Sequence, residues 1–567
     1  MVTSSERGTS SRAIRSSACG PSENTRVVNC GAVTANQLEP AYDYVIVGGG
    51  PAACVLANRL SADPSTRVLL LEAGTGNSSM IRRLLARFTN WFDPELRWQY
   101  ETVPQPGMNG RRVYLPQGRT LGGGSAINAM TYVRGQPADF EAWVRLGNDG
   151  WDYATVLEAY KRLEKNAVLR DEFHSQAGRL SVIDQVHPHR LTQVFVEAGR
   201  QVGLPFNRDF NGRSQLGVGT YQVTQTNGKR CSAADAFLHP VRHRPNLRVR
   251  THAYVTRVCL EGSRATGVEF HAGGRPHRAR AQREVIVSGG AINSPKLLLL
   301  SGIGPADDLR RLGITVAHDL PGVGKNLHDQ LNVQVITRAS RPITYDGWDR
   351  PVPFLRYALQ FALFNSGVAT SNICEGAAFL PGDPGLDVPD IQLHFMPLLW
   401  LNYGRTHIPG HGMTLEAAFL QPLGRGSVTL ASADPSVSPL IDPAYGACPE
   451  DIHGLVQAIR RSREIMQAPA FRPFTDGELY PGRDKQSDAE LADYARQSAI
   501  TTYHPVGSCR MGVDALAVVD PRLRVRGIEG LRVVDSSIMP RITSGSTQAP
   551  SGMIGEMGAA MILKASA

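Results

Sequence analysis

A run of glycines after an apolar segment is the first part of the chain suited to binding a ligand. Residues 44–47 read Tyr-Val-Ile-Val and are followed by Gly48, Gly49 and Gly50. Such glycines allow a tight turn and a close approach of the backbone to a pyrophosphate. Glu72 stands 22 residues after Gly50, where an acidic side chain can accept hydrogen bonds from a ribose. The spacing predicts dinucleotide binding.

The elements that must hold this turn follow in the order strand, helix, strand. Residues 44–47 are predicted as a buried parallel strand, residues 54–60 as a helix, and residues 67–72 as a second strand that ends in the acid. Ala53 is small enough for the helix to pack closely on the strand, and the N-terminus of that helix favours negative charge. An α/β fold with a nucleotide-binding unit is therefore expected.

A second glycine-rich segment covers residues 118–128, with the sequence Gly-Arg-Thr-Leu-Gly-Gly-Gly-Ser-Ala-Ile-Asn. It places many backbone amides in a row, which suits a phosphate or a flat ring system. Leu121 and Ile127 interrupt it with apolar side chains, and this argues against a flexible surface loop. We expect this segment to contact the cofactor.

The composition is that of an ordinary globular protein. The 567 residues are 42% hydrophobic and 20% charged, with a net charge of +9, which is enough chain for several domains of about 100–200 residues each. The basic residues are scattered without interleaved aromatics, so no nucleic-acid partner is expected. The eight cysteines form no CxxC pair and no cluster with histidine at zinc-ligand spacing, so free thiols and no metal site are expected.

Two features bear on the location of the protein. No segment reaches about 18 consecutive apolar residues, so no transmembrane helix is expected. Residues 1–40 are rich in serine, threonine and arginine but also contain acids, so a disordered extension and an organelle transit peptide both fit residues 1–41. We expect a soluble protein, cytoplasmic or, with a transit peptide, organellar. The oligomeric state is left open.

Two more segments complete a family pattern. Residues 290–304 begin Gly-Ala-Ile-Asn-Ser-Pro and follow a predicted strand at 284–288, and residues 503–512 begin Tyr-His-Pro. Together with residues 118–128, the sequence resembles the glucose-methanol-choline family of flavin oxidoreductases, whose two signature stretches occur in order and at the expected distance. The resemblance runs from about residue 42 to residue 563.

The resemblance implies an interleaved architecture, α+β overall. A Rossmann-like FAD-binding domain is expected from residues 42–155, 230–330 and 510–567. A substrate domain built on an antiparallel sheet with helices is expected from residues 156–229 and 331–509.

The resemblance also implies the chemistry. His504 matches the family's catalytic histidine, and Gln548, in Ser-Thr-Gln-Ala-Pro, takes the place of the usual partner His or Asn. With an ordinary pKa near 6.5, a histidine can accept the hydroxyl proton of an alcohol while its hydride moves to the flavin. We expect oxidation of a primary alcohol to an aldehyde, with a rate that rises with pH through the ionisation of His504.

The expected partners are FAD, a small-molecule alcohol, and either oxygen or a separate electron acceptor. Ile127 stands where some relatives carry a histidine bonded to FAD, so the flavin is expected to be noncovalent. The residues expected at the cofactor are Gly48, Gly50, Ala53, Glu72, Arg119, Gly123, Asn128, Ala129, Val255, Asp535, Ser536 and Ala549.

The amino-acid sequences of residues 115–123 and 132–136 resemble those of the choline dehydrogenase branch of the family. In that branch a glutamate holds the trimethylammonium head, and Glu375 looks similar in position. An exposed carboxylate without this role is the alternative for Glu375. His394 matches another active-site histidine of choline oxidisers.

Residues 52–63 and 476–482 instead resemble the fatty acid photodecarboxylases of the same family, and Cys374 aligns with their active-site cysteine. Against this alternative, His394 stands where those enzymes carry a carboxylate-binding arginine, which would form a charge-assisted anchor. They also lack the histidine found here at His504. A non-catalytic flavin-binding protein is the third possibility, and the presence of His504 argues against it.

Overall fold

The computed structural model describes residues 41–76, 94–348 and 350–566. The expected extension at residues 1–41 therefore lies, except for residue 41, outside the described residues. In this part of the chain, no helix is long and apolar enough to cross a membrane.

The glycine turn joins strand β1 (Tyr42–Val47) to helix α1 (Pro51–Leu60), and strand β2 (Val68–Leu71) pairs with β1 in parallel. This is the predicted strand, helix, strand unit. The helix begins at Pro51 rather than at residue 54, because proline lacks only an N–H that the first helical turn leaves unpaired anyway. Gly50 is the N-cap of α1, so the turn and the N-terminus of the helix form one structure.

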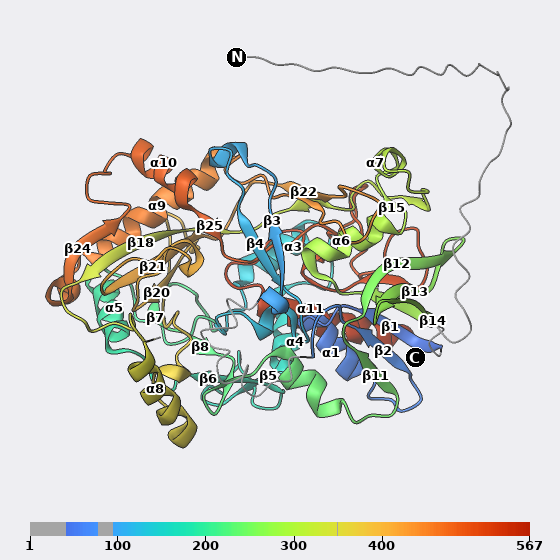
Figure 1. Cartoon of the computed structure of the whole chain (residues 1–567), viewed down its shortest axis with the longest axis horizontal. Coiled ribbons are helices and arrows are strands. Elements are labelled where there is room, and N and C mark those ends of the chain that lie inside the picture. Colours follow the sequence, from blue (N-terminus) through green and yellow to red (C-terminus); the bar gives the residue numbers. More distant parts are fainter. Residues whose placement is uncertain (1–40, 77–93, 349, 567) are drawn as a thin grey trace, which may run out of the picture.

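A seven-stranded sheet extends this unit (Figure 1). Strands β11, β2, β1, β14 and β26 are parallel neighbours, whereas β12, β13 and β14 form an antiparallel meander. In spatial order the strands are β11 (Leu247–Arg250), β2, β1, β14 (Arg275–Val287), β13 (Arg264–Ala272) and β12 (Tyr254–Glu261), with β26 (Leu531–Val533) paired to β14.

Helices pack on this sheet and bury its hydrophobic core. The C-terminal helix α11 (Gln548–Ser566) packs against α1 and against α4 (Tyr153–Leu163). Helix α6 (Gly290–Leu300) follows β14 directly and packs on β12. The N-termini of α1, α6 and α11 belong to three distant parts of the sequence, and the first residue of each lines the same cavity.

A second seven-stranded sheet lies at the other end of the molecule, on the left of Figure 1. Its described pairings are antiparallel throughout. The strands in order are β24 (Thr475–Tyr480), β18 (Leu331–Ala339), β21 (Gly412–Phe419), β20 (Ile391–Met396), β19 (Gly376–Leu380) and β7 (Gly217–Thr220), with β25 (Ile500–Thr501) paired to β18. Packed on or near this sheet are α5 (Arg190–Gln201), α9 (Pro449–Met466) and α10 (Asp488–Ser498).

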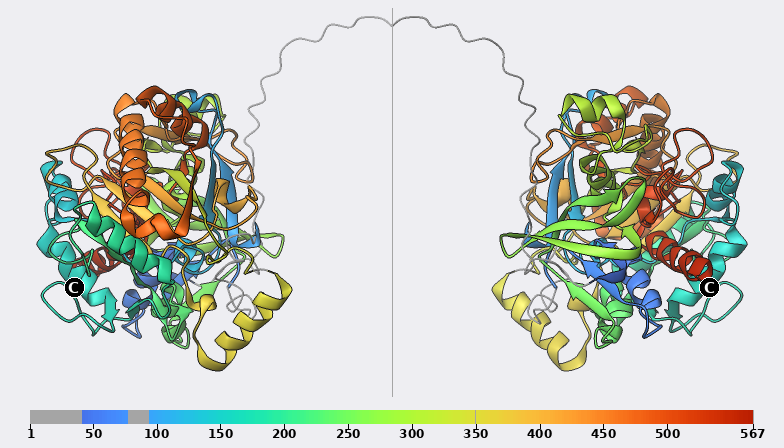
Figure 2. Two further views of the ribbon diagram at one scale, coloured as in Figure 1. Left: turned by 90° about the vertical axis from the view of Figure 1, so that its left-hand side faces the viewer. Right: turned by 90° about the vertical axis from the view of Figure 1, so that its right-hand side faces the viewer.

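Smaller elements connect the two sheets. The short strands are β3 (Arg97–Glu101), β4 (Tyr114–Gly118), β5 (Glu164–Asn166), β6 (Leu180–Asp184), β8 (Gln222–Val223), β9 (Gln225–Thr226), β10 (Lys229–Arg230), β15 (Ile303–Gly304), β16 (His318–Asp319), β17 (Lys325–Leu327), β22 (Gly426–Thr429) and β23 (Leu440–Asp442). The remaining α-helices described are α3 (Pro137–Arg145), α7 (Ala306–Arg311) and α8 (Pro351–Phe364), and α8 projects from the body in Figures 1 and 2.

The mixed fold class predicted from the sequence is confirmed. The strands of the first sheet all come from the three stretches assigned to the FAD domain, and those of the second sheet come from the two stretches assigned to the substrate domain. Some side chains of one assigned domain pack in the core of the other: Tyr100 and Leu115 join the core of the second sheet, and Leu180 joins that of the first. The exact domain boundaries therefore stay a prediction.

Candidate active site

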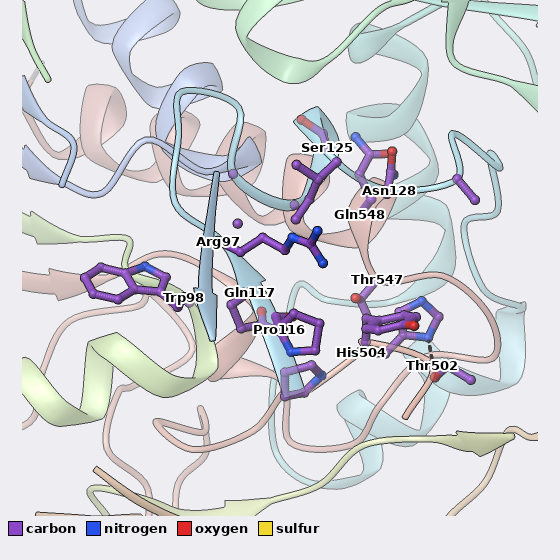
Figure 3. Close-up of a pocket in the computed structure, with 18 of the residues that line it drawn as sticks. Arg97, Trp98, Pro116, Gln117, Ser125, Asn128, Thr502, His504, Thr547 and Gln548 are labelled. Carbon is purple, nitrogen blue, oxygen red and sulfur yellow. Dashed lines mark hydrogen bonds between the residues drawn. The ribbon is translucent and has the colours of Figure 1, made fainter. Parts of the chain in front are cut away.

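A cavity of about 850 Å³ is lined both by the glycine turns and by residues of β20 and β21. Figure 3 shows part of its wall, including Asn128, His504 and Gln548. Its size is in the upper part of the ~300–1,000 Å³ range of ligand sites. Of the residues predicted at the site, the cavity is lined by Gly48, Gly50, Glu72, Gly123, Asn128, Ala129, Val255, Cys374, His394, His504, Asp535, Ser536 and Gln548.

Gly48 and Gly50 serve the turn in different ways. Gly48 has φ of +104°, and a Cβ there would lie 2.3 Å from the carbonyl oxygen of Ser288. Glycine is required at this position because both the backbone conformation and the close neighbour exclude a side chain. At Gly50 the nearest atom to a Cβ would be the same oxygen at 4.0 Å, so this glycine leaves open space toward the cavity.

Glu72 braces the turn from inside. Its Oε2 accepts a hydrogen bond from the Gly49 amide and its Oε1 one from the Gly74 amide, each at 2.7 Å. Burial raises the pKa of this carboxyl, against the effect of the two amides. The acid predicted to bind a ribose thus also fixes the shape of the glycine turn.

The second glycine segment packs directly on the first. A Cβ at Gly123 would lie 2.8 Å from the Cα of Gly50. Further along, the guanidinium of Arg230 donates to the side-chain oxygen of Asn128 at 2.6 Å and to its carbonyl oxygen at 2.7 Å. The two predicted cofactor segments therefore form one wall, and Arg230, which the sequence analysis missed, holds it.

Asp535 links the start of α6 to the segment around Ser537, beside this wall. Its carboxylate accepts from the Gly290 amide at 2.9 Å, from the Ser294 hydroxyl at 2.6 Å and from the Ser537 amide at 2.8 Å. It holds the start of α6 at the cavity.

Three of the predicted cofactor residues lie behind the wall rather than in it. Ala53 and Ala549 are buried in the core. Arg119 lies over the ring of Trp98, with its guanidinium carbon 4.6 Å from the ring centroid, and Trp98 in turn lines the cavity. These residues shape the site through packing.

His504 is held in one tautomer. Its Nδ1 lies 2.9 Å from Oε1 of Gln330, whose amide nitrogen donates to the carbonyls of Leu420 and Thr543. Since that amide oxygen can only accept, Nδ1 must carry the proton. The other nitrogen, Nε2, is then unprotonated, and the hydrogen bonds found within the described ranges give it no partner. Figure 3 shows the ring at the cavity wall.

The electrostatic setting keeps His504 neutral. Burial, with a smaller contribution from the nearby His394, lowers the pKa of His504 to about 3. The sequence predicted that the rate would rise with pH as His504 loses its proton. Because the lowered pKa leaves His504 already neutral near pH 7, no such rise is expected there.

A buried carboxylate fixes the backbone of the same segment. Asp329 accepts from the His504 amide at 2.9 Å and from the hydroxyls of Tyr445 and Thr501. Tyr503, just before His504, has φ of +66°, a strained conformation that costs on the order of 1–3 kcal/mol and persists only where the surroundings impose it. Asp329 and Gln330, missed from the sequence, supply that constraint.

His394 favours the opposite tautomer to His504. The side-chain amide of Gln392 donates to the hydroxyl oxygen of Tyr221 at 2.7 Å, and that hydroxyl lies 2.9 Å from Nδ1 of His394. The phenol oxygen accepts from Gln392 and keeps its own proton available for Nδ1; a neutral ring bonded in this way carries its proton on Nε2. Burial lowers the pKa of His394 to about 4. The cavity thus holds one neutral imidazole that can accept a proton and one that can donate a hydrogen bond.

Gln548 is the first residue of α11 and lines the cavity. Its side-chain oxygen is buried and has no hydrogen-bond partner in the structure. Since a buried polar atom without a partner is costly, this oxygen is suited to a bound ligand.

Glu375 is placed differently from either expectation. It is completely buried, so the alternative of an exposed carboxylate is wrong. Oε2 accepts from the His189 amide at 2.6 Å and the Thr192 hydroxyl at 2.7 Å, and Oε1 accepts from the hydroxyls of Ser371 at 2.6 Å and Tyr345 at 2.8 Å. Glu375 does not line the cavity, and four donors already occupy its oxygens.

What Glu375 does hold is a strained turn at the cavity wall. Ser371, bonded to Glu375, accepts from the amide of Ile373 at 2.9 Å. Ile373 has φ of +69°, which is unusual for a β-branched residue, and both Ile373 and Cys374 line the cavity. Burial raises the pKa of the Cys374 thiol, so the thiol stays protonated.

A glutamate that does line the cavity, beside His394, is Glu416, for which the sequence carried no prediction. It pairs in register with His394 across β20 and β21, and both line the cavity. Burial raises the pKa of Glu416 to about 7, opposed by a hydrogen bond from Trp400. Trp348 and Trp400 line the same cavity. No local sequence signal marks Glu416, since it lies in an apolar strand far from the signature segments.

A second polar cluster lies away from the cavity. Asp171, His174 and Asp209 are placed closely enough to hold a metal. However, the two ring nitrogens of His174 already pair with Glu164 at 3.0 Å and with Asp209 at 2.9 Å. Although burial opposes it, these partners raise the pKa of His174 to about 9, so the cluster is an ion-pair network with Arg134, which contacts Glu164 at 2.7 Å.

Comparison with known proteins places this geometry in context. Two family models described as GMC oxidoreductase match residues 42–332 and 422–555. The chain is 42% identical to the alcohol dehydrogenase [acceptor] of Pseudomonas putida over 530 residues, which cover 92% of this chain and 96% of that protein. It is 41% identical to the mitochondrial choline dehydrogenase of Mus musculus, covering 98% and 94% of the two chains.

Solved structures agree with this result. The crystal structure of pyridoxine 4-oxidase from Mesorbium loti matches with a TM-score of 0.84 at 32% identity, over 92% of this chain and 99% of that one. A formate oxidase of Aspergillus oryzae RIB40, from work on its FAD modification, matches with a TM-score of 0.85 at 26% identity, over 93% and 98%.

Proposed function

The chain belongs to the GMC oxidoreductase family, and on this premise we propose that it oxidises a primary alcohol to an aldehyde, with His504 accepting the hydroxyl proton beside a bound FAD. The observation that carries the proposal is the unprotonated Nε2 of His504 at the cavity, held there by Gln330. The chain is a flavoprotein oxidoreductase by family, so the proposal concerns the residues, the substrate and the attachment of the cofactor.

The residues around the cavity fit FAD. Gly50, Gly124 and Gly290 leave open space where a side chain would stand, and they lie in or beside turns that expose backbone amides suited to phosphate. The partnerless oxygen of Gln548 can accept a hydrogen bond from the cofactor or the substrate. Ile127 lines the cavity without any group that could bond to the flavin, and this supports noncovalent attachment.

When bound, FAD supplies the acceptor for the hydride of the alcohol. Nε2 of His504 takes the hydroxyl proton, and Nε2–H of His394 can donate a hydrogen bond to the same oxygen. Because both rings are neutral well above their lowered pKa values, the pair is ready for this exchange at neutral pH without a prior ionisation.

Glu416 and the two tryptophans favour a substrate with a cationic head. A carboxylate near aromatic rings is suited to a quaternary ammonium group, through charge and cation–π attraction. We therefore assign to Glu416 the role that the sequence suggested for Glu375, and we propose choline-like amino alcohols as the preferred substrate class. The name of the mouse relative supports choline and a mitochondrial location. Oxygen and a separate electron acceptor both remain candidates for reoxidation.

Fatty acid photodecarboxylation is the alternative that the sequence left open. Cys374 does line the cavity, but its thiol is protonated and Glu416 stands close enough to affect its pKa. A second carboxylate from a fatty acid would meet that negative charge, and His394 stands where the photodecarboxylases carry their carboxylate-binding arginine. The geometry therefore favours alcohol oxidation.

The test is anaerobic mixing of the holoenzyme with choline and, separately, with 3,3-dimethylbutan-1-ol, its uncharged isostere. Bleaching of the flavin absorbance by either alcohol supports the proposal, and faster bleaching by choline supports the cationic substrate class. Release of hydrocarbon from palmitate under blue light, with no bleaching by alcohols, would overturn it. Acid precipitation should release the flavin into the supernatant.

A further inference from the structure

Helix α8 presents an apolar face to solvent. Val352, Leu355, Leu359 and Leu363 follow one another at spacings of three and four residues, which places them on one side of the helix. Their exposed fractions are 80%, 69%, 57% and 63%. A surface helix normally turns such a stripe toward the core, so the orientation of α8 is reversed.

The helix has few contacts with the rest of the molecule. Phe361 is its one buried residue, and Figures 1 and 2 show the helix standing out from the body in each view. Phe364, at its C-terminal end, is 72% exposed. Exposed apolar area of this kind marks a surface that is covered in use.

The charges of the helix indicate what covers it. Residues 351–364 contain no acid, Arg356 lies at the edge of the apolar stripe, and Arg350 is the N-cap. Both arginines are exposed. An apolar stripe flanked by basic residues is the arrangement of helices that lie in the interface of an anionic membrane. For a protein partner, we would instead expect the apolar stripe to be surrounded by polar side chains that include both positive and negative charges.

The helix is continuous with the wall of the cavity. Trp348 and Arg350, which immediately precede it, line the cavity, as do Arg405 and His407 from another loop. A membrane held by α8 would therefore lie next to this part of the cavity wall.

We propose that α8 docks this protein on the surface of an anionic lipid bilayer, with its apolar stripe among the acyl chains and Arg350 and Arg356 at the headgroups. The protein is then held at one leaflet without crossing it. This inference does not depend on the reaction proposed above. It gives a substrate or an electron acceptor dissolved in the bilayer a short path to the cavity.

The test is co-sedimentation of the holoenzyme with vesicles of phosphatidylcholine, alone and with added phosphatidylglycerol. We expect binding that increases with phosphatidylglycerol and decreases at high salt. The double variant Leu359→Glu and Leu363→Glu should reduce the bound fraction at least about tenfold, because the charges cannot enter the acyl region. Arg356→Gln should weaken only the phosphatidylglycerol-dependent part.

The matched control is the double variant Leu146→Glu and Leu423→Glu, whose leucines are 46% and 48% exposed on other parts of the surface. It should bind vesicles as the unmodified protein does. Both double variants should retain flavin and be bleached by alcohol in solution at the normal rate. The proposal is overturned if the unmodified protein stays in the supernatant with both vesicles, or if the two double variants bind equally. It is also overturned if α8 instead holds two copies of the chain together. Sedimentation would then show a dimer that the double variant Leu359→Glu and Leu363→Glu dissociates.

Discussion

At the scale of single residues, the site depends on which nitrogen of each imidazole carries the proton. Gln330 holds the proton of His504 on Nδ1, and Tyr221 places that of His394 on Nε2. In the proposed reaction the two rings play complementary roles toward one hydroxyl group. Their residue types suggest this chemistry, but the roles are assigned by partners 174 and 173 residues away in the sequence.

Replacing His504 by alanine should slow flavin reduction by the alcohol about 10²–10⁴-fold, the usual contribution of a general base. The flavin should remain bound, since the substitution leaves the glycine turns of the proposed flavin site unchanged. Gln548→Ala should cost less. Anaerobic stopped-flow reduction measures these rates, and an unchanged rate in His504→Ala would reject the mechanism even though the family assignment stands.

The pH dependence of the reaction rates distinguishes the effect of His504 from that of Glu416. Because the pKa of His504 is lowered to about 3, reduction by the neutral 3,3-dimethylbutan-1-ol should be nearly independent of pH from about 5 to 8. The pKa of Glu416 is about 7, so its carboxylate forms as the pH rises. The kcat/KM for choline should therefore rise with pH through about 7, while His394 and the Cys374 thiol keep their neutral forms.

Glu416→Gln should remove this rise and lower kcat/KM for choline by roughly tenfold or more, since an ion pair with the substrate is lost. The value for 3,3-dimethylbutan-1-ol should change by less than about threefold. Steady-state kinetics across this pH range give the comparison. Equal losses for both alcohols would show that Glu416 shapes the pocket without recognising charge, and the same experiment on Glu375→Gln provides the contrast with a carboxylate outside the cavity.

At the scale of elements, the strand, turn and helix at residues 42–60 show why two neighbouring glycines are not equivalent. Gly48 is required by the backbone, whereas at Gly50 the protein itself leaves room for a side chain, so a requirement for glycine there would come from the proposed ligand. The sequence predicts both as glycines of one motif. The structure separates them, because what a Cβ would meet depends on residue 288, which the fold brings to this turn.

Gly50→Val should abolish retention of FAD with little loss of folding, because its side chain would enter open space that the pyrophosphate needs. Gly48→Ala should instead lower the thermal stability of the protein even without flavin, since its Cβ would meet the Ser288 carbonyl at 2.3 Å. Flavin content after gel filtration and the apparent Tm of the flavin-free protein distinguish the two. Retained flavin in Gly50→Val would contradict this assignment.

Helix α8 is the element least explained by local sequence. Its residues have a helical spacing and apolar character, but only the fold shows that the apolar stripe faces outward. A sequence pattern cannot state which side of a helix the rest of the chain covers.

At the scale of the whole molecule, the network of Arg134, Glu164, His174 and Asp209 joins the first stretch assigned to the FAD domain with the stretch assigned to the substrate domain. The folded-state pKa of His174 is raised from 6.5 to about 9. Its contribution to stability is therefore fully present below about pH 6.5 and is lost as the pH rises through about 9.

The apparent Tm should accordingly fall by a few degrees between pH 6 and pH 10, and this fall should be smaller in His174→Gln. The difference between the two proteins at each pH isolates the contribution of His174 from that of other groups. Differential scanning fluorimetry measures it. Parallel curves for both proteins would show that His174 does not couple to folding.

The sequence by itself determined the family, the mixed fold class and the identity of the segments that form the cavity wall. These follow from local patterns: glycines that allow a close backbone approach, apolar runs that predict strands, and signature stretches in their usual order. The three helix N-termini that meet at the cavity were each marked by such a pattern.

Only the tertiary structure decided which of the two glutamates lies at the cavity, which nitrogen of each histidine is free, and which apolar helix face is left uncovered. Glu375 and Glu416 are both glutamates in apolar surroundings, and nothing in their neighbouring residues distinguishes them. The difference is that four donors occupy Glu375, three of them from segments at least 30 residues away, while the pairing of β20 with β21 places Glu416 beside His394. The physical reason is that solvation and hydrogen bonding depend on what the fold brings within a few ångströms, and most of those neighbours are far apart in the sequence.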